Sequence, residues 1–278
     1  MAQIVAAASI AHTALMVRAK DKAPKEQADT VYAAFAEMRR RLEEKKADAL
    51  VVFSAEHLKT FFLDNMPSIC IGIGERGQGW GEAGVPAYQV PIDQPLAKHL
   101  LDYSLEHDFD PSFSYDMKLD HGFMVPLHFL TPNMDIPIVP IFMNAAALPL
   151  SPMKRMFRFG EIISQAICQW DSSKRIALIA TGGVSHWVAV PRMGEVAEEF
   201  DRRFIDKMLQ HKEEEVLRWT NEEIESEAGN GALEIRAWMA LAGAVPQGDR
   251  ELLCYEPVHA WATGIAVMDF MGGDGRDE

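Results

Sequence analysis

Several histidines in this sequence come directly after short apolar runs. They are His12 after residues 3–10, His57 after residues 47–54, and His186 after residues 176–180 and a Gly-Gly pair. A neutral imidazole offers a nitrogen lone pair to a metal ion, and its pKa near 6.5 also lets it take up and release protons at neutral pH. These histidines can therefore serve a metal centre or acid–base chemistry, provided that the fold brings the ends of the runs together.

The runs themselves predict buried strands, because each is short and mostly apolar. Between the first two, residues 24–46 predict an amphipathic helix in which Val31 and Phe35 lie on the apolar face. A strand, a helix and a second strand within about 55 residues form a βαβ unit, whose two strands are parallel. His12 and His57 should then emerge at the same edge of the sheet, where open α/β sheets bind their ligands.

The rest of the chain continues this alternation of strands and helices. Strands are predicted at 68–74, 88–92, 136–143, 252–255 and 264–270, and helices at 93–107, 151–170, 194–217 and 233–242. The prolines in 136–143 indicate an irregular or edge strand. Residues 222–231 are predicted to be a break. Residues 74–84 are predicted to form a glycine-rich loop, which lacks the spacing of a dinucleotide-binding motif. The fold class is α/β, with a central mostly parallel or mixed sheet flanked by helices. We expect one catalytic domain over residues 1–271 and a disordered tail over 272–278.

Composition limits the function. The 278 residues carry a formal charge of −14, which opposes binding to nucleic acids and to anionic membranes. No stretch approaches the roughly 20 apolar residues that span a bilayer. The first apolar run is short and lacks a basic leader, so we expect no cleavable signal. The three cysteines are far apart and odd in number, which is typical of a reduced, cytoplasmic protein.

Two histidines at adjacent strand ends, together with one carboxylate, leave positions open on an octahedral metal. This facial triad is typical of non-haem Fe(II) oxygenases. His12 and His57 are the natural pair, and Glu234 is the best carboxylate, because it lies in an apolar helical stretch after a Gly-Asn-Gly break. A structural alternative is that Glu234 pairs with Arg236. The other carboxylates considered as ligands are Glu56 and Glu256.

Five segments, taken together and in order, also resemble a known family. They are Ser9–His12, Phe53–His57, Asp120–Phe123, Gly182–His186 and Leu233–Trp238. Each segment alone is a weak signal, but their order and separation are similar to those of the class III extradiol ring-cleavage dioxygenases, the group of the protocatechuate 4,5-dioxygenase β subunit. The resemblance extends from the N-terminus to about Gly264.

The resemblance implies specific roles for five residues. His12, His57 and Glu234 would bind Fe(II), His186 would act as acid and base, and His121 would transfer a proton or hydrogen-bond beside the substrate. The implied reaction is cleavage of a catecholic aromatic by O₂ to a muconic semialdehyde-type product. The resemblance also implies a homo- or hetero-oligomer and leaves room for a small α subunit.

Three alternatives stay open at this point. The same ligands serve aminophenol-cleaving relatives, in which an amine replaces one hydroxyl group. A zinc ion at these ligands would activate water for hydrolysis. A metal-binding regulatory subunit without turnover is the third, and the retention of His121 and His186 argues against it. The identity of the metal and the consumption of oxygen distinguish a dioxygenase from the zinc-type hydrolase.

Overall fold

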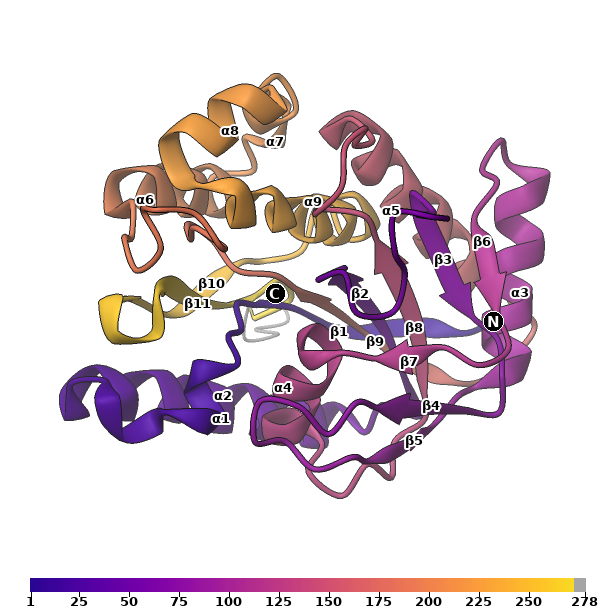
Figure 1. Ribbon diagram of the computed structural model, residues 1–278. Coiled ribbons are helices and arrows are strands. Elements are labelled where there is room, and N and C mark those ends of the chain that lie inside the picture. The colour runs from indigo at the N-terminus through magenta and orange to yellow at the C-terminus, as the bar shows by residue number, and fades with distance from the viewer. Residues whose placement is uncertain (273–278) are drawn as a thin grey trace, which may run out of the picture.

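An eight-stranded mixed sheet forms the centre of the computed structural model, which describes residues 1–272 (Figure 1). Its spatial order is β10 (Glu251–Val258), β11 (Thr263–Asp269), β1 (Gln3–Ile10), β9 (Arg175–Thr181), β2 (Ala49–Ala55), β8 (Ile138–Met143), β3 (Ile69–Gly72) and β6 (Ser112–Ser114). The four adjacent strands β1, β9, β2 and β8 are parallel, while β11 and β3 pair with them in the antiparallel sense. The predicted single α/β domain with a mixed sheet is confirmed. The tail predicted to be disordered lies outside the described residues, apart from Gly272.

Helices cover both faces of the sheet, as Figure 1 shows. On one face lie α5 (Met153–Gln169) and α9 (Ile235–Ala244), and on the other α2 (Lys25–Lys45) and α4 (His121–Leu130). Every residue of α9 is buried, which explains its almost wholly apolar sequence. The remaining helical segments are α1 (Leu15–Arg18), η1 (Lys20–Lys22), α6 (Glu198–Leu209), α7 (Glu213–Val216), α8 (Asn221–Ala228), η2 (Asn230–Glu234) and η3 (His259–Trp261).

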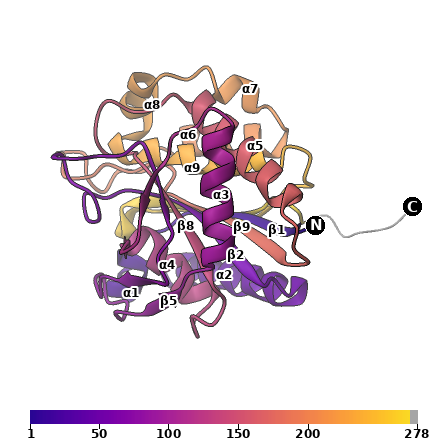
Figure 2. The same ribbon diagram turned by 90° about the vertical axis from the view of Figure 1, so that its right-hand side faces the viewer.

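A helix and a small second sheet complete the fold. Figure 2 shows α3 (Gln94–Glu106) at the side of the molecule, where it packs on α5, β3 and β8. As predicted, Asp93 caps this helix, since its carboxylate accepts a hydrogen bond from the backbone N–H of Leu96 at 3.2 Å. The second sheet has the order β5 (Gln89–Pro91), β4 (Arg76–Gly79) and β7 (Lys118–Leu119). The glycine-rich segment is therefore partly a strand and not wholly a loop.

The prediction of an edge position for the proline-containing strand was wrong. β8 lies inside the sheet, between β2 and β3. Its antiparallel pairing with β3 stops at Ile141, so β3 does not need the N–H that Pro140 lacks. The next residue of β3 is Gly72, and a Cβ there would lie 2.6 Å from Cγ of Pro140. The absence of a side chain at Gly72 thus gives the proline ring its space.

Two helix predictions also need correction. Residues 222–227 belong to helix α8 and are not a break, because Thr220 and Glu223 form a capping box that begins this helix. The long helix predicted over 194–217 is divided into α6 and α7. Among the described residues, none of the helices combines the length and apolar character needed to cross a membrane.

We expect Gly72→Ala to lower the free energy of unfolding by about 1–3 kcal/mol, because the new methyl group overlaps the ring of Pro140. Urea unfolding measures the change. In a Pro140→Ala background the same substitution should cost less than about 0.5 kcal/mol, as a double-mutant cycle would show. Equal costs in both backgrounds would contradict the steric explanation.

Candidate active site

Three parallel strands end at one edge of the sheet, and each leads to a histidine. His12 and His57 come two residues after β1 and β2, and His186 follows β9, which lies between these two strands. The rings of His12 and His57 lie 5.3 Å apart, centre to centre. His121, the first residue of α4, completes the group, with its ring centre 4.1 Å from that of His57 and 5.7 Å from that of His12. The fold thus brings together all four histidines selected from the sequence.

His57 is held by a carboxylate on one side and faces another on the opposite side. Its Nδ1 donates a hydrogen bond of 2.7 Å to Oδ2 of Asp120, the residue that caps α4. Its Nε2 lies 3.1 Å from Oε1 of Glu234. Burial opposes the charged form of His57, but the carboxylates of Asp120 and Glu234 prevail and raise its pKa well above the usual value. Asp120 fixes the tautomer of His57, so a neutral ring presents the lone pair of Nε2 to the site.

Glu234 is a buried carboxylate among imidazoles. It lies at the junction of η2 and α9, and its Oε2 accepts a hydrogen bond of 2.7 Å from the backbone N–H of Gly183. Its Oε1 is also 3.3 Å from Nε2 of His186. Burial favours the neutral acid, but His186 and His57 outweigh it and lower the pKa of Glu234 well below the usual value. Glu234 therefore keeps its negative charge inside the protein.

His12 is the least basic of the group. Burial lowers its pKa to about 3, so the ring is neutral. Its Nδ1 is buried and has no hydrogen-bond partner within residues 1–272, which is uncommon for a buried polar atom in a folded protein. A neutral, buried imidazole is well suited to ligate a metal ion.

Two donor sets that could hold a metal share His12 and His57. Ligand atoms of His12, His57 and His121 all lie within 4.8 Å of one another. In the second donor set Glu234, which contacts His57, takes the place of His121 as the third ligand. Without a metal, the raised pKa of His57 supplies a proton to its contact with Oε1 of Glu234. A metal ion that displaces this proton would take Nε2 of the then neutral ring and the carboxylate as ligands.

The segment that carries His186 is fastened on both sides. The backbone N–H of His186 donates to the carbonyl of Ala228, and its carbonyl accepts from the N–H of Gly231. Ser185 is bound to Asp201 of α6 by its N–H and its hydroxyl, both at 2.8 Å. Gly231 also leaves room for the ring, since a Cβ there would lie 2.1 Å from Nε2 of His186. The Gly-Asn-Gly segment thus supports this histidine.

The alternatives weighed for the carboxylates can now be compared with the structure. Arg236 donates to the carbonyl of Leu233 and to Asn221, so its hydrogen bonds do not go to Glu234. Glu256 accepts from Gln27, and Glu56 accepts from backbone N–H groups of the loop after His57. Asp120 and Glu82, the carboxylates that contact His57 and His121, were not among the residues predicted from the sequence. Asp120 is adjacent to His121 in the sequence, and this adjacency is the local signal that could have pointed to Asp120 as a residue of the site.

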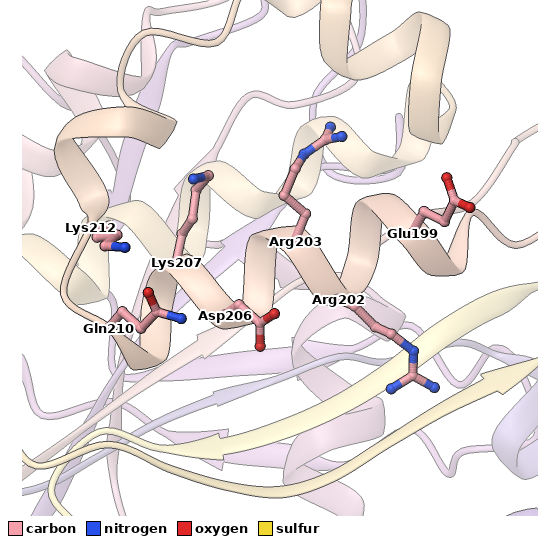
Figure 3. Close-up of a pocket in the computed structure, with 7 residues that line it drawn as sticks. All are labelled: Glu199, Arg202, Arg203, Asp206, Lys207, Gln210 and Lys212. Carbon is pink, nitrogen blue, oxygen red and sulfur yellow. The ribbon is translucent and has the colours of Figure 1, made fainter.

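A surface pocket of about 410 Å³ lies elsewhere, and Figure 3 shows its lining on α6 and the residues that follow it. Arg202, Arg203, Lys207 and Lys212 give it a basic lining on an otherwise acidic protein. Three of these cations are already paired, Arg202 with Glu198, Arg203 with Glu227 and Lys207 with Glu215. None of the histidines of the candidate site lines this pocket, so we place the chemistry at the strand ends.

Comparison with known proteins agrees with this geometry. The family described as the catalytic LigB subunit of aromatic ring-opening dioxygenase matches residues 6–266. The chain belongs to this family. The match includes all five residues selected from the sequence, and the resemblance to extradiol ring-cleavage dioxygenases is confirmed.

Individual relatives and one solved structure extend the comparison. A 2,3-dihydroxyphenylpropionate/2,3-dihydroxicinnamic acid 1,2-dioxygenase of a Rhodococcus species is 27% identical and covers 97% of this chain and 99% of its own. The proteins of that name from Klebsiella pneumoniae and Xanthobacter autotrophicus are each 28% identical, and cover 86% and 89% of this chain and 90% and 93% of their own. The crystal structure of the uncharacterized protein JW3007 from Escherichia coli K12 has a TM-score of 0.63 at 14% identity, covers 96% of this chain and 99% of its own, and supports the fold.

We expect Gly231→Ala to lower turnover by roughly 100-fold or more, because the methyl group displaces the ring of His186, and loss of a general acid or base typically costs that much. Steady-state kinetics measures the loss, and circular dichroism checks the fold. Glu222→Ala is the control, since this side chain is exposed on α8 and lies outside the site. Unchanged turnover in the Gly231 variant would show that the position of His186 is not critical.

Proposed function

We propose that this protein is an Fe(II)-dependent extradiol dioxygenase that cleaves the ring of a catechol with O₂ to a muconic semialdehyde-type product. The observation that carries the proposal is the approach of Nε2 of His57 to Oε1 of Glu234 at 3.1 Å, a contact that holds a proton which a divalent cation can displace. Two ligands at about 2.1 Å from one octahedral ion, at right angles to each other, lie about 3 Å apart. This separation supports Glu234 as the third ligand beside His12 and His57.

The charges of this ligand set suit a ferrous centre. His12 and His57 contribute no charge and Glu234 contributes one negative charge, so a divalent ion keeps a net positive charge that favours the deprotonated catechol. Asp120 supports His57 from behind, in the manner of the carboxylates that orient metal-bound histidines. An Fe(II) ion held here would bind both catechol oxygens and supply the redox chemistry with O₂.

The remaining histidines would move protons at the substrate. Nδ1 of His186 donates to the carbonyl of Val184, so a neutral ring has its lone pair on Nε2, the nitrogen that would take a phenolic proton and return it later. The ring of His121 lies 4.1 Å from that of His57, centre to centre, and His121 would serve a second oxygen atom. The hydrogen bonds of His186 with Ala228 and Gly231 restrict its segment, which fixes the direction of the transfer.

Substrate, assembly and location are also proposals. The names of the relatives favour a catechol with a carboxylated side chain, so 2,3-dihydroxyphenylpropionate leads the substrate panel. We assign the catalytic domain to residues 1–271 and place the protein in the cytoplasm as an oligomer, with a small α subunit as an optional partner. Light scattering of the purified chain tests whether it is an oligomer. Activity of the purified chain without any other protein tests whether a small α subunit is needed.

We expect one Fe(II) per chain after anaerobic reconstitution. A metal at about 100 times its dissociation constant should raise the melting temperature by about 5–10 °C. Glu234→Gln and His12→Ala should lose both the metal and this stabilisation, while His121→Asn should keep them. Metal analysis and calorimetry measure these effects. If His121→Asn loses the metal and Glu234→Gln keeps it, the third ligand is His121 and not Glu234.

We expect oxygen uptake and a yellow product when catechols are added to the reconstituted protein. His186→Ala should lower turnover by roughly 100-fold to 10,000-fold and still bind one iron, because it removes a proton acceptor and not a ligand. An oxygen electrode and absorbance spectra record both results. No oxygen uptake with any catechol or aminophenol, despite one bound iron, would refute the dioxygenase proposal and direct attention to hydrolysis with zinc.

A further inference from the structure

The glycine-rich segment of residues 74–84 has no part in the function proposed above. Its strand β4 pairs with β7, with Gly79 opposite Leu119, and the N–H of Trp80 donates to the carbonyl of Leu119 at 3.1 Å. β7 leads directly into Asp120 and His121 at the start of α4. This pairing brings the end of the glycine-rich segment beside the candidate active site.

Glu82 of this segment makes two contacts with His121 through one oxygen atom. Its Oε1 accepts a hydrogen bond of 3.0 Å from the backbone N–H of His121, and Nδ1 of the same residue lies 3.1 Å away. The hydrogen bond from His121 lowers the pKa of Glu82, so this carboxylate is ionised at neutral pH and can only accept. Nδ1 of His121 must therefore carry the proton.

The tautomer determines what the other side of the ring can do. With the proton on Nδ1, a neutral His121 has its lone pair on Nε2. The ring packs against His57, at 4.1 Å between centres, and close to His12. A carboxylate behind an imidazole holds its orientation and also stabilises the cation that forms when Nε2 takes a proton.

We propose that Glu82 is a positioning residue that holds His121 with Nδ1–H directed away from the metal centre, so that Nε2 can accept the proton of a substrate hydroxyl group. This inference rests on the proposed function. In the step, the O–H bond of the substrate breaks, an N–H bond forms at Nε2, and the electron pair stays on the oxygen. Glu82 compensates the charge of the resulting imidazolium.

Lys59 gives Glu82 a second anchor. Its Nζ lies 3.4 Å from Oε2 of Glu82, the oxygen that does not contact His121. Lys59 follows His57 by two residues, so the pair joins the loop after β2 to the glycine-rich segment. The side chain of Lys59 is 49% exposed, and the ion pair alone contributes little to stability. The two contacts with His121 are therefore the ones to test.

The test compares Glu82→Ala with Glu82→Gln in the iron-loaded enzyme. Glu82→Ala removes the acceptor and should lower kcat by roughly 10-fold to 100-fold, with the iron content unchanged and KM within about threefold. Glu82→Gln keeps an acceptor oxygen and should recover part of the loss. Glu161→Gln on α5 is the matched control, because Glu161 is also partly exposed and pairs with Arg158 at 2.7 Å, outside the site.

A second readout does not depend on turnover. In ¹⁵N-histidine-labelled, zinc-loaded protein, the imidazole shifts of His121, assigned with His121→Asn, should report the Nδ1–H form. Glu82→Ala should produce a mixture of tautomers, and Glu161→Gln should not. An unchanged tautomer in Glu82→Ala, or a loss of iron in proportion to activity, would overturn the assignment. If the native enzyme cleaves no catechol, the proposed function fails, and the tautomer measurement still decides the role of Glu82.

Discussion

The negative charge of Glu234, buried among imidazoles, is the constraint on which the site depends. A carboxylate removed from water is stable only when cations or hydrogen bonds compensate it. Glu234 receives the N–H of Gly183 and stands at the N-terminal end of α9, where the helix dipole favours a negative charge. Its other oxygen faces His57 and His186. A proton on these rings or a metal ion between them completes the compensation, and the proposed ferrous ion takes the second role.

The ends of the parallel strands place the histidines beside the carboxylate of Glu234. Ile10 of β1 and Phe53 of β2 pair with Thr181 and Ala180 of β9, so the three strands end almost level. His12 comes two residues after Ile10, the last residue of β1, and His57 two residues after Ala55, the last residue of β2; these strands lie on either side of β9. This placement agrees with the general rule that ligands bind beyond the carboxyl ends of parallel strands. The helices contribute the groups that the strands cannot, namely Glu234 from the start of α9 and His121 from the start of α4.

Local signals in the sequence were sufficient for most of the fold and for the choice of histidines. The apolar runs before His12 and His57 marked buried strands, and the helix between them made those strands parallel. The position of β9 between β1 and β2 depends on contacts across more than 100 residues, so the two histidines lie on strands that are not neighbours. Pro140 was misleading for a similar reason, because Gly72, which accommodates its ring, is far away in the sequence. The contact of Glu82 with His121 has the same long-range origin. Which residues hold a metal stays a prediction.

Different partners behind the imidazoles give similar side chains different chemistry. His57 has the buried carboxylate of Asp120 behind it, and His121 has the partly exposed carboxylate of Glu82. Nδ1 of His186 contacts the carbonyl of Val184, and Nδ1 of His12 has no partner in the part of the chain that the structure describes. A carboxylate strengthens the basicity of the opposite nitrogen, whereas a carbonyl fixes the tautomer without adding charge. If His121 and His186 serve one substrate, as proposed, Glu82 would compensate a positive charge on His121 from behind the ring, whereas Glu234 would compensate a charge on His186 at its Nε2.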